Sequence, residues 1–191
     1  MAHSMASVLS PGALPLAELH AARLDGELFT IDERFSPVDE VETAWLRARA
    51  LRSVAGTRMI AELDSALWVH GLLPVVPSIH TMCVPRSDRL KFPPSPRFVL
   101  REMTHEPGDT MEIAGLRVTV PARILHDLAL VEREDVVGAA RSILGRHPEL
   151  AHECARRISD TPNLPGKGRA LRRLEEWDVS DSQPALTRYT S

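Results

Sequence analysis

The sequence predicts an α+β fold in which helices flank a small, mostly antiparallel sheet and the C-terminal part is helical. Strand-like segments follow one another in the middle of the chain rather than alternating with helices, which favours α+β over a doubly wound α/β sheet. Amphipathic segments separated by prolines fill the last third. The composition, 43% hydrophobic and 26% charged over 191 residues, is that of a globular chain of one or two small domains.

The N-terminal third is predicted to contain a short helix and a strand before its first long helix. Residues 1–14, rich in Ser, Pro and Gly, are expected to be a flexible lead. A helix is predicted from Pro15 to Asp25 and a strand over 27–31, followed by a turn at Ser36-Pro37. These elements, with an amphipathic helix over 38–54, form the predicted N-terminal segment 15–55.

The segment 56–178 is predicted to be the core with its C-terminal helices. Thr57 is expected to cap a helix that Gly71 ends, and strands are predicted over 78–84, 97–103 and 116–120. Pro121 suits the first turn of a helix that runs to about residue 132. Further helices are expected near 135–144, 149–158 and 167–177, and the polar tail 179–191 is left without assigned structure.

The net charge of −3 conceals a segregated distribution of charged residues. Between residues 25 and 42 the chain has seven acidic residues and a single basic residue, Arg34. Residues 86–101 and 156–173 are, in contrast, strongly basic. Such patches are either solvated faces or interaction surfaces. Candidate partner contacts are Asp25, Glu27, Asp32, Glu33, Asp39 and Glu40; candidate nucleic-acid or phosphate contacts are Arg86, Arg89, Lys91, Lys167, Arg169, Arg172 and Arg173.

Motifs for catalysis, cofactors and metals are absent from the sequence. It contains no Gly-x-Ser-x-Gly, His-Glu-x-x-His, Cys-x-x-Cys or Gly-x-Gly-x-x-Gly pattern. The candidate histidines, His70, His80, His105 and His126, form no close pair at helical spacing with a nearby Cys or carboxylate in a known pattern. We therefore expect no metal, and we expect no cofactor or catalytic residue either. Cys83 and Cys154 are expected to be buried thiols.

The absence of a long apolar run predicts no membrane contact and a cytoplasmic location. No segment approaches the ~20 apolar residues that a membrane-spanning helix needs. The uncharged start of the chain lacks the basic region of a secretory signal. Aromatic residues make up only 4% of the chain, which argues against a base-stacking platform for single-stranded nucleic acid.

Two segments, read together, resemble a known family. Ser65-Ala66-Leu67-Trp68-Val69-His70-Gly71-Leu72, followed by a strand ending in Val84-Pro85, is similar to a helix and strand of AbiEi-like antitoxins. Gly115-Leu116-Arg117-Val118-Thr119-Val120-Pro121-Ala122-Arg123-Ile124-Leu125-His126-Asp127-Leu128-Ala129 is similar to a later segment of that family, in the same order. The residues of these motifs that we expect to support the scaffold are His70, Gly71, Pro121, Arg123 and Asp127.

The resemblance implies the antitoxin of a type IV toxin-antitoxin pair, which opposes a nucleotidyltransferase-like toxin of the AbiEii type. Such antitoxins often repress their own operon through an N-terminal winged helix, and segment 15–55 is expected to be a reduced form of that domain. Its acidic stretch has the wrong sign for contact with phosphates. Ile124 replaces a threonine of the family pattern.

Three functions follow from these observations. The first is an antitoxin that acts mainly through protein contact, with the acidic stretch docking on a basic surface of the toxin. The second is a DNA-binding autoregulator of the operon that uses the basic residues. The third is a nuclease-like enzyme, for which the sequence offers no Asp/Glu-x-Lys cluster after a strand.

Overall fold

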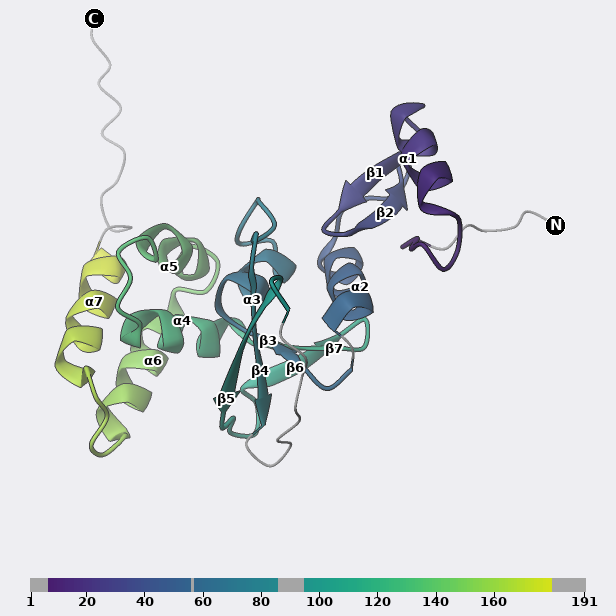
Figure 1. The fold of residues 1–191 in the computed structure, drawn as a ribbon. Coiled ribbons are helices and arrows are strands. Elements are labelled where there is room, and N and C mark those ends of the chain that lie inside the picture. The colour runs from purple at the N-terminus through teal and green to yellow at the C-terminus, as the bar shows by residue number, and fades with distance from the viewer. Residues whose placement is uncertain (1–6, 56, 86–94, 180–191) are drawn as a thin grey trace, which may run out of the picture. The chain divides into compact units, whose positions relative to one another are not determined.

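Two groups of elements, Met1–Thr119 and Val120–Ser191, make up the chain (Figure 1). The structure is a computed structural model that describes residues 7–55, 57–85 and 95–179. These residues form seven helices, a five-stranded sheet and a two-stranded hairpin, which confirms the α+β class. The predicted boundary between residues 55 and 56 lies inside the first group.

The N-terminal elements form a small core of their own. Helix α1 (Leu16–Leu24) packs on strand β1 (Leu28–Ile31), which pairs with β2 (Arg34–Pro37) as an antiparallel hairpin. The turn predicted at Ser36-Pro37 is wrong, because both residues lie in β2 and the chain reverses at Asp32, whose φ is +53°. The side chains of this core are Leu9, Leu19, Leu28 and Phe35.

The five-stranded sheet is mixed rather than mostly antiparallel. Its order is β5-β4-β3-β7-β6, where β3 is Ile60–Ala61, β4 is His80–Pro85, β5 is Phe98–Met103, β6 is Thr110–Ile113 and β7 is Leu116–Thr119. The pairs β3–β4 and β6–β7 are antiparallel, whereas β4–β5 and β3–β7 are parallel. Strand β5 runs in the same direction as β4, and a parallel pair cannot be joined by a tight turn.

Two helices pack beside this sheet. Helix α2 (Ala44–Ala55) begins six residues later than predicted, where the hydroxyl of Thr43 accepts a hydrogen bond from the Leu46 N–H at 3.3 Å. Helix α3 (Leu63–Val69) ends near Gly71 as expected, but Ile60 and Ala61, predicted as helix, form the central strand β3. A short buried strand and a buried helix segment have the same apolar pattern, so periodicity alone does not separate them.

The second group consists of four helices, all predicted to within a few residues. They are α4 (Pro121–Leu130), α5 (Val137–Leu144), α6 (Glu149–Asp160) and α7 (Lys167–Val179). Pro121 opens α4 at its first turn, and α7 packs against each of the other three helices. Among the described residues, no helix combines the length and the apolar character that crossing a membrane requires.

Candidate functional site

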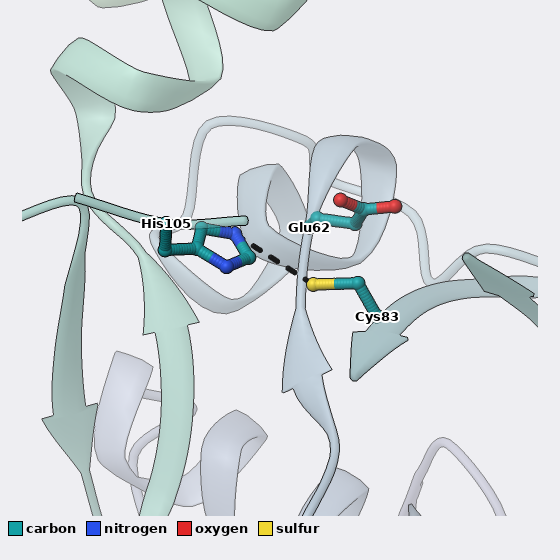
Figure 2. Close-up of side chains that lie close together, drawn as sticks. All are labelled: Glu62, Cys83 and His105. Atoms are coloured by element: carbon teal, nitrogen blue, oxygen red, sulfur yellow. Dashed lines mark hydrogen bonds between the residues drawn. The ribbon is translucent and has the colours of Figure 1, made fainter. Parts of the chain in front are cut away.

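Three side chains with metal-binding atoms meet beside the central strand of the sheet (Figure 2). Glu62 follows β3, Cys83 lies within β4, and His105 follows β5. Antiparallel pairing places Ile60 opposite Cys83, which brings the end of β3 next to the middle of β4. The Cys83 Sγ atom lies 3.7 Å from Nε2 of His105, and one ligand atom from each of the three residues lies within 4.8 Å of the others.

Burial and charge distinguish this cluster, which we call the Glu-Cys-His cluster, from a surface group. Glu62 and Cys83 have no exposed surface, and His105 is half-buried. The Arg101 side chain, on the neighbouring strand β5, places Nη1 3.3 Å from Oε1 of Glu62. The backbone next to Glu62 is strained, because the buried Leu63 has a φ of +47°. The cluster therefore combines a buried carboxylate, a buried thiol and an imidazole.

A second buried group connects Ser65, His80 and Asp32. The Ser65 Oγ lies 2.9 Å from Nδ1 of His80, and Nε2 of His80 lies 3.3 Å from Oδ2 of Asp32. A Ser-His-Asp order is also that of a hydrolase triad. Here all three side chains are buried, and the Ser65 Oγ accepts a hydrogen bond from the Thr81 N–H. A substrate does not reach such a hydroxyl, so the group serves the fold.

The predicted acidic contacts separate into two sets. Asp32 forms an ion pair with Arg97, and Glu33 lies 2.8 Å from the same guanidinium. Asp25, Glu27, Asp39 and Glu40 are exposed. These four lie on neighbouring segments, because the Val38 N–H donates a hydrogen bond to the Glu27 carbonyl at 3.0 Å. The hairpin thus keeps four carboxylates available at its open end.

The predicted basic contacts of α7 bind carbonyl groups at the ends of other helices. Arg173 donates hydrogen bonds to the Arg133 carbonyl at 2.7 Å and to the Val131 carbonyl, and Lys167 donates to the Thr161 carbonyl at 3.2 Å. Arg169 pairs with Glu132 at 2.6 Å, and Arg172 is exposed. Cations at helix C-termini stabilise unpaired carbonyls, which accounts for these positions without nucleic acid. Arg86, Arg89 and Lys91 lie outside the described residues.

The residues of the family motifs make local contacts. His70 Nε2 lies 2.8 Å from the Thr119 carbonyl oxygen, and burial lowers the pKa of His70 although this hydrogen bond opposes the shift. Gly71 adopts a φ of +72° directly after the end of α3. Pro121 opens α4, where Nε of Arg123 donates to both carboxylate oxygens of Asp127 at 3.0 Å.

A pocket of about 360 Å³ next to α2 carries positive charge and hydroxyl groups that the sequence analysis did not single out. Arg49 and Arg52 are one turn apart on α2, and among the described residues neither guanidinium has a hydrogen bond or an ion pair. Arg49 lies over the Trp45 ring at 5.0 Å. The pocket is lined by Val8, Ser10, Arg49, Arg52, Ser53, Thr57 and Ala114.

The sequence signals for these groups were weak for a physical reason. Cys83 and His105 were each noted, but they are separated along the chain, and Glu62 fell inside a predicted helix. Only the pairing of β3 with β4 brings Glu62 to Cys83. Arg49 and Arg52 lie on the polar side of an amphipathic helix, where arginines are common without a ligand.

Comparisons with known proteins give little to set beside this geometry. No protein-family profile matches the chain, and no curated protein matches it. A solved structure, the crystal structure of the RV2827C protein from Mycobacterium tuberculosis, is distantly similar. It shares 14% sequence identity, with a TM-score of 0.44, over 94% of this chain and 74% of that chain.

Proposed function

We propose that this chain is a non-enzymatic, cytoplasmic antitoxin that restrains a nucleotidyltransferase-like toxin through protein contact. Two things support the proposal. The segments around Ser65–Leu72 and Gly115–Ala129 resemble AbiEi-like antitoxins. The open end of the hairpin, where the Val38 N–H donates to the Glu27 carbonyl, carries exposed apolar and acidic side chains.

That surface, which we call the hairpin surface, is the observation that carries the proposal. Leu24, Val38 and Val41 are 77%, 56% and 74% exposed. Exposed apolar side chains grouped together are typical of protein interaction sites, and burying them provides affinity. The hairpin surface consists of Leu24, Asp25, Glu27, Val38, Asp39, Glu40 and Val41.

The charge of the hairpin surface selects the kind of partner. Carboxylates at the rim of an interface favour a basic partner and repel an acidic one. An enzyme that transfers nucleotides to RNA must itself hold phosphate groups, for which basic side chains are suited. The hairpin surface is therefore complementary to the substrate-binding face of such a toxin and would block that face when bound.

Co-expression with a nucleotidyltransferase-like toxin of the AbiEii type tests the proposal. The wild-type chain should restore growth and copurify with the toxin, and the charge-reversed variant Asp39→Lys/Glu40→Lys should do neither. The matched control is Glu175→Lys/Asp178→Lys, which makes the same charge change at exposed positions of α7. If the wild-type chain leaves growth and toxin activity unchanged, the antitoxin proposal is wrong. If both variants protect the cells equally, the hairpin surface does not contact the toxin.

The α2 pocket favours DNA binding as a second candidate function. Two arginines without ion pairs in the described part of the chain, with the hydroxyls of Ser10, Ser53 and Thr57, match the donors that hold a phosphate. Binding of the operon's promoter DNA should weaken with salt. Arg49→Gln/Arg52→Gln should reduce the magnitude of the slope of log K against log salt by about two, because two phosphate contacts are lost. Arg172→Gln, on α7, is the control and should leave this slope unchanged. Binding that does not depend on salt, or no binding at all, would contradict this function.

A further inference from the structure

We propose that Glu62, Cys83 and His105 form a binding site for one Zn²⁺ ion. Thiolate, imidazole and carboxylate are the three side-chain groups that zinc prefers in proteins. A mixed set of this kind, with a sulfur ligand, favours zinc over magnesium or calcium, which take oxygen ligands only. The inference is independent of the antitoxin proposal, because it depends on the interior of the sheet and not on the hairpin surface.

The distance between Cys83 and His105 fits a shared metal ion. Zinc-ligand distances of about 2.3 Å for sulfur and about 2.0 Å for nitrogen, at a tetrahedral angle, place the two ligand atoms about 3.5 Å apart. The observed separation of Sγ and Nε2 is 3.7 Å. Glu62 lies farther out, with all three ligand atoms within 4.8 Å of one another, so a small rotation of its side chain would complete the set.

Burial and charge support the same assignment. A thiolate and a carboxylate together balance the charge of Zn²⁺, which makes their burial beside the metal far less costly than the burial of either charge alone. Arg101 approaches Oε1 of Glu62 at 3.3 Å with a side chain that is 41% exposed. This contact is an ion pair, and it holds Arg101 beside the carboxylate of Glu62.

The position in the fold indicates what the ion would do. The ligands come from the end of β3, the middle of β4 and the segment after β5. One ion would therefore fix the segment after β5 to the sheet. Because the site supplies three ligands, the fourth tetrahedral position of the ion would hold a water molecule. We expect Zn²⁺ to stabilise the native chain, because an ion that binds only the folded state shifts the folding equilibrium toward it.

Titration of the full chain with Co²⁺ after chelator treatment tests the site, because cobalt reports its ligands by absorption. We expect one Co²⁺ per chain, with a thiolate-to-metal charge-transfer band that Zn²⁺ abolishes by displacement. Cys83→Ser should lose the band, and His105→Gln should weaken binding roughly tenfold or more. Cys154→Ser is the matched control, because Cys154 is also buried and is not part of the cluster.

Several outcomes would overturn the proposal. If the wild-type chain shows no charge-transfer band, the cluster does not bind the metal. The same conclusion follows if the band survives in Cys83→Ser and disappears in Cys154→Ser. A thermal midpoint that does not rise with Zn²⁺ contradicts the stabilising role. If Cys83→Ser does not fold, His105→Gln decides, because His105 lies outside the helices and strands. A folded His105→Gln, checked by circular dichroism, with wild-type affinity would exclude the site.

Discussion

Nε2 of His80 lies 3.3 Å from Oδ2 of Asp32, and both side chains are buried although they come from different sheets. Asp32 is in the turn of the β1–β2 hairpin, and His80 begins β4. The other oxygen of Asp32 pairs with Arg97, which precedes β5. This single carboxylate therefore connects the hairpin to two strands of the larger sheet.

Asp32→Ala should lower the free energy of unfolding by about 2–3 kcal/mol. The substitution removes the carboxylate that lies beside the buried imidazole of His80, and it removes the ion pair of Arg97. Urea denaturation measures the loss. Asp39→Ala, at an exposed position, should stay within about 0.5 kcal/mol of the wild type, and an equal loss in both variants would contradict the bridging role of Asp32.

Arg173→Met should destabilise the C-terminal helices by about 1–2 kcal/mol, whereas Arg172→Met should change stability by less than about 0.5 kcal/mol. Arg173 donates to carbonyls that follow α4, and its neighbour Arg172 is exposed. Met preserves the length and helix propensity of the side chain, so the comparison isolates the hydrogen bonds. Equal thermal midpoints for the two variants would show that Arg173 does not stabilise α4.

Stability should fall as the pH drops below about 6.5, in part because of His70. Burial lowers the pKa of His70, so the unfolded chain takes up a proton in a pH range where the folded chain does not. This loss is at most about 1.4 kcal/mol per pH unit for one proton, and it ends below the lowered pKa of the folded state. Above pH 6.5 the imidazole is neutral in both states and makes no such contribution.

The His70→Gln variant identifies the share of His70 in that pH dependence. Glutamine keeps an N–H donor for the Thr119 carbonyl but does not titrate. Urea denaturation between pH 5 and pH 8 should give a shallower decline than in the wild type. His152→Gln, at an exposed position of α6, is the control. If stability declines as shallowly in that variant, His70 is not the cause of the pH dependence.

Gly115→Ala should destabilise the chain by about 1–2 kcal/mol, and Gly138→Ala should stabilise it by about 0.5–1 kcal/mol. A Cβ atom on Gly115 would lie 2.9 Å from Nε of Arg52, and the φ of Gly115 is +79°. Gly138 is within α5, where a Cβ meets nothing within 4 Å. Thermal unfolding of the two variants should therefore show shifts of opposite sign. Shifts of the same sign would contradict the strain that the positive φ of Gly115 imposes on a residue with a Cβ atom.

The helices were predictable because their signals are local. Pro121 at the first turn of α4, the recurrence of apolar residues at spacings of three and four, and Gly71 after α3 are all readable within a few residues. The strands were less so: β3 has two residues, and β6 was not predicted at all. A short strand is stabilised by its neighbours in the sheet, and those neighbours have no signature in the strand itself.

The sequence by itself determined the α+β class, the four C-terminal helices and the separation of acidic from basic segments, since composition and periodicity are properties of the chain. The tertiary structure decided which charges are engaged, as at Asp32 and Arg173, and which remain exposed, as at Asp39. It also brought Glu62, Cys83 and His105 together. Strand order and register create such groupings, and both arise from packing between distant segments rather than from any local pattern.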